Sequence, residues 1–406
     1  MWGGIKTGNW LTPARLRDYP IILLAISLLA AIVWIALADG LIDRQGKPIG
    51  TDFSNVWAAG RLVLAAEPEK PYDPVRQHAA EQQAFAPHPV PFFGWHYPPF
   101  FLIVAAALAL LPYAWSLLLW MAVTLSAYLA VIRSIVPRGE TMLLALAFPA
   151  VTVNLGHGQN GFLTAALLGG SLVLLDKRPV AAGVLIGLLA YKPQFGVLIP
   201  LALLAGAHCR ALAGASVTVL LASVVTLLLF GPEVWQAFFA STGFTRTVVL
   251  ETGNTGWEKI QSLFSAIRMW GGSIEAAYAG QAALALVLGA SIAWLWHGRA
   301  DSDLKAAALP CACLLATPYV LDYDFVVLAV AIAFFVRFAL IHGFCDYEIS
   351  ALAFVWIMPL VARSCDDTLR VPLGLICVAL LYGLILRRAL GERHAAADKP
   401  NALARA

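Results

Sequence analysis

Long apolar runs separated by short polar connections dominate the pattern of this chain. The first run, residues 21–37, reaches the length of a full membrane span. Eleven further apolar segments follow, at residues 98–132, 141–155, 159–175, 179–190, 195–207, 211–230, 277–297, 305–317, 322–341, 349–362 and 371–388. The pattern predicts an all-α polytopic membrane protein with about twelve transmembrane segments.

Several of these segments are shorter than one bilayer. They are expected to be broken helices that line a protein-enclosed cavity, or spans completed by flanking residues, because lipid-exposed irregular backbone would leave polar groups unpaired. Residues 98–111 are predicted to form a re-entrant or interfacial helix, with residues 114–132 as the true span. "ALAD" at residues 36–39 resembles a signal-peptidase site, but the length of the first run favours a retained anchor.

Lysine and arginine sort the connections between segments, because they accumulate on the cytoplasmic side. With the N-terminus inside, the basic connections and the C-terminal tail also fall inside. The external set is then residues 39–97, 156–160, 191–194, 231–276, 317–324 and 362–370. We expect residues 1–395 to form one integral-membrane domain with an external catalytic loop at 39–97, a second large external loop at 231–276 and a disordered cytoplasmic tail at 396–406.

Composition supports this class of protein. Hydrophobic residues make up 60% of the 406 residues and charged residues 13%, against about 25% charged in an ordinary soluble domain. The net charge of +3 comes from arginines scattered between apolar runs, so membrane lipids are expected partners and nucleic acid is not. The six cysteines lie mostly within or beside apolar runs and are predicted to be buried structural thiols.

Asp52 stands just outside the first span, at the start of a stretch whose apolar residues recur at helical spacing. The stretch predicts an amphipathic helix in the membrane interface. Asp52 is either the N-cap of this helix or a carboxylate placed for general-base catalysis. Arg61 on the same helix is either a solvated charge or a contact for a phosphate.

Two further polar clusters fall on the external side. His96 and Tyr97 precede a proline pair that opens the next apolar run, where aromatic residues commonly anchor a chain to the interface. "NLGHGQNGF" at residues 154–162 places His157, Gln159 and Asn160 among three glycines, which suits close approach to a ligand, although a plain glycine-rich turn is the alternative. It lacks the Gly-Lys-Ser/Thr ending of a nucleotide-binding loop.

Lys192 lies between two apolar half-segments and is followed by a proline. A charge at membrane depth normally faces a cavity or an anionic partner, so Lys192 is a candidate contact for a lipid phosphate, with snorkelling to the surface as the alternative. "ATPYVLDYDF" at residues 316–325 adds Tyr319, Asp322 and Asp324. These form a polar wall of the site, a weak metal site or an interfacial cap.

Five motifs, in this order along the chain, carry a resemblance to a known family. They are "TDF" with "WAAGRLVLAAEPEKPYDP" (51–74), "HYPPF" with "LLP" (96–112), "NLGHGQNG" (154–161), "AAGVLIGLLAYKPQ" (181–194) and "ATPY" (316–319). Together they resemble glycosyltransferase family 87, which includes polyprenol-phosphate-mannose-dependent mannosyltransferases. In several relatives a histidine is found after the late proline, where this chain has Tyr319.

The resemblance implies a GT-C fold in a bacterial plasma membrane, with the active site outside and both termini cytoplasmic. It implies an inverting transfer of mannose or another hexose or pentose, from a polyprenyl-phosphate donor to a hydroxyl of an envelope lipid or glycan. Asp52 matches the family's catalytic base, and the remaining candidates would bind the donor or substrate. No cofactor and no metal is expected. A secondary transporter or a lipid-binding envelope protein is the alternative.

Overall fold

The computed structural model describes residues 2–403, in which the regular secondary structure is helical. Backbone pairing between strands is limited in this range to three isolated bridges. Six segments are long and apolar enough to cross a membrane. They are α2 (Pro13–Ala36), α6 (Tyr113–Ile135), α12 (Cys209–Phe230), α15 (Ile274–His297), η5 with α17 (Asp322–Val327 and Leu328–His342) and the first part of α20 (Leu373–Leu403). The chain is therefore a multi-pass membrane protein.

The other apolar segments form shorter or broken helices. One bent pair counts as a seventh candidate span: α18 and η6 meet α19 at 73°. The predicted count of about twelve spans is thus not confirmed, because residues 141–205 and 302–316 are folded into pieces below span length. The pieces are α7 (Thr141–Leu146), α8 (Pro149–His157), α9 (Gly161–Leu174), α10 (Pro179–Leu188), η2 (Leu189–Tyr191), η3 (Pro193–Gly196), α11 (Ile199–Ala205) and α16 (Ser302–Ala316), and the bent pair comprises α18 (Glu348–Ile357), η6 (Met358–Leu360) and α19 (Ala362–Leu369).

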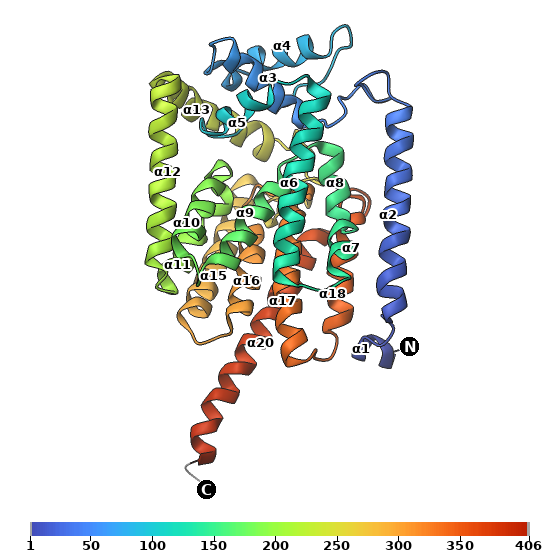
Figure 1. Cartoon of the computed structure of the whole chain (residues 1–406), viewed down its shortest axis with the longest axis vertical. Coiled ribbons are helices and arrows are strands. Elements are labelled where there is room, and N and C mark those ends of the chain that lie inside the picture. Colours follow the sequence, from blue (N-terminus) through green and yellow to red (C-terminus); the bar gives the residue numbers. More distant parts are fainter. Residues whose placement is uncertain (1, 404–406) are drawn as a thin grey trace.

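A layer of short helices covers one end of the bundle (Figure 1). We call it the cap layer; it contains α3 (Phe53–Leu64), η1 (Lys70–Tyr72), α4 (Pro74–Ala84), α5 (Phe101–Leu108) and α13 (Pro232–Phe244). Helix α5 packs against α3 in this layer and does not run along the bundle, as expected for residues 98–111. Gly60 allows the close approach, since a Cβ there would lie 2.1 Å from the carbonyl oxygen of Ala105.

Helix α3 is less exposed than an interfacial helix would be. Phe53, Ser54, Asn55 and Val56 are buried, because α4 and α5 both pack against α3. The amphipathic pattern therefore reflects burial against protein as well as any contact with lipid.

The centre of the bundle is formed by α16 and the segment Asp322–His342. Almost every residue of α16 is buried, and α15, α17 and α20 pack around it. Its small and aliphatic side chains suit this position, because a helix that is apolar on all sides can be surrounded by other helices. The remaining elements are the N-terminal α1 (Trp2–Thr7), the π-helical turn η4 (Thr245–Glu251) and α14 (Leu263–Met269).

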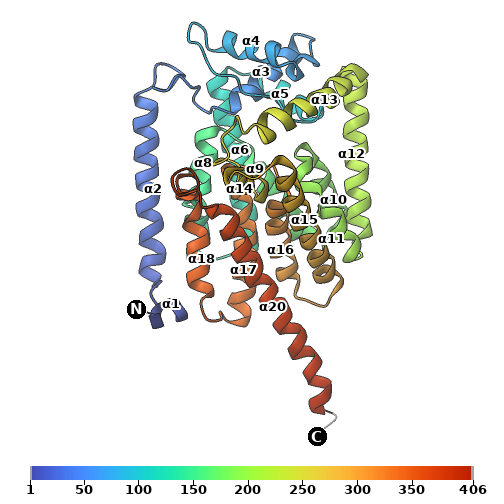
Figure 2. The same ribbon diagram turned by 180° about the vertical axis from the view of Figure 1, so that it is seen from behind.

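Both ends of the described chain lie at the end of the bundle opposite the cap layer (Figures 1 and 2). Ion pairs gather at this opposite end: Arg337 binds Asp303, and the buried Glu348 binds Arg387 and Arg388. The tail predicted for residues 396–406 begins inside α20, whose helix continues through Leu403. Residues 404–406 lie outside the described residues.

The cysteines differ in their exposure to solvent. Cys311, Cys313 and Cys377 are buried, as predicted, whereas Cys209 and Cys345 are exposed and Cys365 is intermediate. The prediction of buried thiols was wrong for the exposed pair, because Cys209 is the first residue of α12, next to a polar connection, and Cys345 lies in the connection between α17 and α18.

Candidate active site

A cavity of about 580 Å³ lies beneath the cap layer. It collects residues from separate connections that the sequence places on one side of the membrane. Eight of the eleven predicted site residues line it: Asp52, His96, Tyr97, His157, Gln159, Lys192, Tyr319 and Asp322. The three that do not are Arg61, Asn160 and Asp324.

Asp52 occupies the N-cap position of α3, but its side chain does not cap the helix. Instead, Oδ2 accepts a hydrogen bond from Gln159 Nε2 at 3.1 Å. The carboxylate is 21% exposed and lines the cavity. The geometry therefore favours the interpretation of Asp52 as a carboxylate available to a ligand in the cavity over its interpretation as a helix cap.

The amide of Gln159 has only one orientation compatible with its surroundings. Its Oε1 accepts from the backbone N–H of Asn160 at 3.0 Å and from the hydroxyl of Tyr97 at 3.3 Å. Asn160 Nδ2 in turn donates to the Tyr97 oxygen at 2.8 Å. Because an amide oxygen can only accept, Nε2 is the atom that faces Asp52. Asn160 is therefore a buried support and not a cavity residue.

The rest of the 154–162 loop fixes the backbone beside Asp52. The backbone carbonyl oxygen of His157 accepts a hydrogen bond from the backbone N–H of Asp52 at 3.0 Å. His157 Nδ1 bonds the hydroxyl of Thr51 at 2.8 Å and lies 4.0 Å from Asp52 Oδ2. Gly158 adopts φ +64°, and a Cβ there would lie 2.7 Å from Cβ of Phe53, so glycine is required.

Lys192 is buried at the break between η2 and η3, with its side chain only 4% exposed. Its Nζ donates to Asp324 Oδ1 at 2.6 Å, and Asp324 is 1% exposed. The other oxygen of Asp324 accepts from the backbone N–H of Leu321 at 3.0 Å. Lys192 therefore does not snorkel to the surface; it lines the cavity as half of a buried ion pair.

Asp322 and Asp324 face different partners. Asp322 lines the cavity, with its Oδ2 3.9 Å from Arg363 Nη1, whereas Asp324 turns away to Lys192. The two carboxylates do not converge on one position, so the arrangement supports the polar wall and not a shared metal. Tyr319 completes this wall, and burial raises the pKa of its hydroxyl.

His96 connects two parts of the cap. Its Nδ1 bonds Thr245 Oγ1 at 2.8 Å, which ties the segment before α5 to the π-helical turn η4. Burial lowers the pKa of His96 to about 4. The imidazole is therefore neutral at physiological pH and offers hydrogen bonds, but no charge, to a ligand.

Arg61 is exposed on the far side of α3. Its guanidinium lies over the ring of Trp57, 5.6 Å from the centroid, and it does not line the cavity. Its position favours the solvated charge over a phosphate contact in this cavity, because at position 61 the helical turn directs the side chain away from Asp52.

The sequence did not single out several cavity residues. Asn55 and Lys47 come from residues 39–97, and Thr245, Asn254 and Lys259 come from residues 231–276. Lys259 is fixed through its backbone, because its carbonyl oxygen accepts from the N–H of Asp322 at 3.1 Å. The 231–276 segment carries polar residues without a motif, so only its predicted location on the same side as Asp52 could have indicated them.

Glu81 supports the cavity wall from α4. It is fully buried, and its carboxyl group accepts from the backbone N–H of Phe93 at 3.1 Å and from Gln77 Nε2 at 3.4 Å. Phe93 lines the cavity. Burial raises the pKa of Glu81 from 4.5 to about 8, so the folded protein holds a proton there that the unfolded chain releases.

This raised pKa predicts a pH-dependent stability. Between pH 4.5 and about 8 the folded state binds more protons at Glu81, so the free energy of unfolding should fall as pH rises through this window. Glu81→Gln should flatten that fall and leave the variant more stable than the parent above pH 8. Thermal unfolding in detergent from pH 5 to 9 measures both. An unchanged slope in the variant would contradict the assignment.

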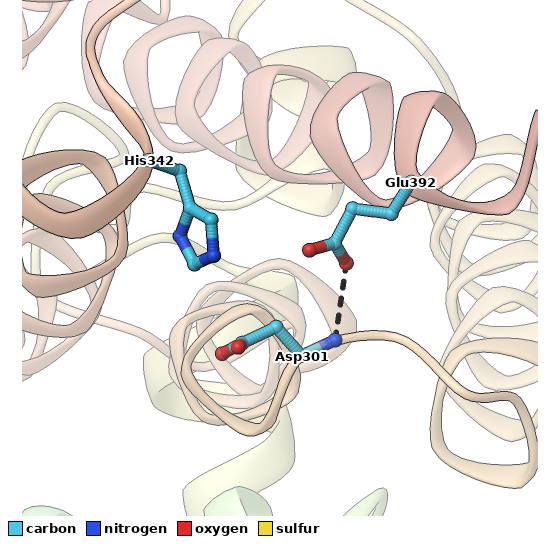
Figure 3. A group of neighbouring side chains, drawn as sticks. All are labelled: Asp301, His342 and Glu392. Carbon is cyan, nitrogen blue, oxygen red and sulfur yellow. Dashed lines mark hydrogen bonds between the residues drawn. The ribbon is translucent and has the colours of Figure 1, made fainter. Parts of the chain in front are cut away.

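A separate group of candidate metal ligands lies at the opposite end of the bundle. Asp301, His342 and Glu392 each offer one ligand atom, all within 4.8 Å of one another (Figure 3). Glu392 already accepts from the backbone N–H of Asp301 at 3.1 Å, and His342 Nδ1 bonds the carbonyl of Phe338. This group belongs to α16, α17 and α20 and takes no part in the cavity.

Comparison with known proteins identifies a family for this chain. A family model described as glycosyltransferase family 87 matches residues 95–318, more than half of the chain. The match includes His96, Tyr97, the 154–162 loop and Lys192, while Asp52 precedes it. No curated protein and no solved structure matches.

Proposed function

The chain belongs to glycosyltransferase family 87 and is a membrane glycosyltransferase; on that premise, we propose that it transfers a sugar from a polyprenyl-phosphate donor with inversion at the anomeric carbon. The proposed fold is GT-C, and the proposed acceptor is a hydroxyl of an envelope lipid or glycan. Mannose is the first sugar to test, followed by other hexoses and pentoses.

One observation carries this proposal: the Asp52 carboxylate is held in the cavity by Gln159 and is not used to cap α3. In the proposed step, an acceptor hydroxyl oxygen attacks the anomeric carbon while its proton passes to Asp52. The bond from that carbon to the phosphate oxygen breaks, and polyprenyl phosphate leaves with the electron pair. Attack from the opposite face inverts the configuration, so one base is sufficient, unlike the carboxylate pair of glycosidases.

The cations in the cavity suit an anionic leaving group. Lys47, Lys192 and Lys259 all line it. The charge of Lys192 is shared with Asp324. In the described part of the chain Lys259 forms no ion pair within 4.0 Å and interacts with Asp322 only at longer range. We therefore propose that Lys259 supplies net positive charge to the phosphate and that Lys192 supplies a fixed donor, which together stabilise the developing charge.

The direct test is turnover of labelled donors. Purified protein should release free polyprenyl phosphate from a polyprenyl-phosphate sugar only when an acceptor is present, and the new glycosidic bond should have the inverted configuration. Donors that carry mannose, glucose and arabinose identify the sugar. A protein that binds these donors but never releases polyprenyl phosphate would be a carrier and not an enzyme.

We propose that the cavity faces the outside of a bacterial plasma membrane and that both termini are cytoplasmic. In protein with Cys209, Cys345 and Cys365 replaced by serine, a cysteine at Asn254 should react with an impermeant thiol reagent added to intact cells. A cysteine at Arg138 should react only after lysis. Both Asn254 and Arg138 are exposed, so access depends on the side of the membrane. The reverse pattern would overturn this orientation.

A further inference from the structure

Asn55 is a cavity residue whose side chain the fold does not use. It lies one turn beyond Asp52 on α3, is only 5% exposed and lines the cavity. Its Oδ1 is buried and has no hydrogen-bond partner among the described residues. A buried amide oxygen without a partner lowers the stability of the folded state, so the position calls for an explanation.

Packing and helix formation do not explain an asparagine at this position. Asparagine has a low helix propensity, and Asn55 Oδ1, in the first turn of α3, accepts no hydrogen bond that would cap the helix. The one bond at position 55 that involves another element is from Gln77 Nε2 to the backbone oxygen of Asn55, at 3.0 Å. Any amino acid at this position would accept that bond, so the amide group of Asn55 contributes nothing to it.

The location of Asn55 separates it from other residues with an unpaired buried atom. Such atoms also occur on Gln77, Asn160 and six further described side chains. Of these residues, Asn55 is the one that lines the cavity containing Asp52. The unpaired amide and the proposed base therefore share one cavity and, with a spacing of three residues, one face of α3.

We propose that Asn55 hydrogen-bonds a saccharide hydroxyl beside the reacting centre and helps to determine which sugar is accepted. This inference rests on the proposed glycosyl transfer. The amide can present its nitrogen as a donor or, after rotation about its terminal bond, its oxygen as an acceptor, and a sugar hydroxyl can pair with either. A substrate lacking that hydroxyl would leave the amide unpaired in a desolvated site, so it would be discriminated against.

The test uses Asn55→Leu, which keeps a similar volume and removes the amide. Its melting temperature in detergent should equal or exceed that of the parent, because an unpaired buried polar group is removed. Citronellyl phosphate serves as a short, soluble analogue of polyprenyl phosphate, and its affinity is measured with and without an attached mannose, glucose or arabinose. The KM for octyl glycosides, which serve as simple acceptors, is measured in parallel. Asn55→Leu should weaken either the gain in affinity due to the donor sugar or the acceptor KM by about 3- to 10-fold.

Ser54→Ala is the matched control on the same helix. Ser54 is also buried, but it does not line the cavity, and its hydroxyl donates to the Thr51 carbonyl oxygen at 2.6 Å. This variant should show the opposite pattern: a lower melting temperature with unchanged sugar recognition. The two variants together separate a role in recognition from a role in folding.

Each outcome has a defined meaning. A loss in the donor comparison assigns the hydroxyl to the donor sugar, and a loss in acceptor KM assigns it to the acceptor. A lower melting temperature for Asn55→Leu with unchanged donor and acceptor constants would overturn the inference and make Asn55 structural. If parent protein binds none of the citronellyl phosphates, the proposed function itself fails.

Discussion

Asp52→Asn should lower sugar transfer by about 10²- to 10⁴-fold while donor binding and folding persist. The range is the usual contribution of a general base. The variant removes the proton acceptor but retains an oxygen that can accept from Gln159, the partner of Asp52 at 3.1 Å. Folding should survive because the carboxylate does not cap α3. Initial rates with labelled donor, together with affinity for citronellyl phosphate, measure the two effects separately.

Asp73→Asn provides a control for the change in charge. Asp73 is exposed in the same 39–97 segment, lies outside the cavity and caps α4 by accepting from the N–H of Val75 at 2.9 Å. An asparagine can also cap a helix, so this variant should retain near-normal transfer. The role of Asp52 would be falsified if folded Asp52→Asn protein transferred sugar at a rate close to that of the control.

Lys192→Ala should reduce the free energy of unfolding by about 3–5 kcal/mol, since it leaves the buried carboxylate of Asp324 without its partner. Asp324 is 1% exposed and bonds Lys192 at 2.6 Å. Thermal unfolding in detergent measures this effect. A melting temperature within a degree of the parent would indicate that Asp324 is uncharged or rearranges to a new partner.

The double variant Lys192→Met with Asp324→Leu tests the function of the lysine apart from its role in stability. Replacing both members of a buried ion pair by apolar residues of similar size is often neutral or stabilising, so the double variant should fold. Its affinity for citronellyl phosphate then reports the contribution of the Lys192 ammonium group. Unchanged affinity would assign the phosphate to Lys259 and Lys47 alone.

The sequence predicted the class of fold and most of the cavity for one physical reason. Apolar runs mark the membrane segments, and the bias of lysine and arginine assigns the connections to sides. The sequence alone therefore predicts that Asp52, His157 and Lys192 lie on the same side of the membrane. The number of spans could not be predicted, since a proline or glycine break divides several runs into helices that are too short to count by length.

Contacts between distant residues were beyond sequence reasoning. Lys192 and Asp324 are 132 residues apart, and both were predicted as ligand contacts because nothing in the chain indicates that each neutralises the other. Asn55 and Lys259 were missed for a related reason: each is an ordinary polar residue outside the recognisable motifs, Asn55 on α3 and Lys259 in the 231–276 segment. Their position in the cavity depends on how α3 and the second loop pack.

In the proposed mechanism, the hydrogen bonds around Asp52 also bear on how the base is regenerated after each turnover. Asn160 donates to Tyr97, Tyr97 donates to Gln159, and Gln159 donates to the Asp52 carboxylate. An amide does not relay a proton, so this chain of hydrogen bonds cannot carry a proton away from Asp52. His157 lies 4.0 Å from Asp52 and is engaged by Thr51. In the proposed mechanism, we therefore expect a proton taken by Asp52 to leave through water in the cavity, which requires that the product first makes room for solvent.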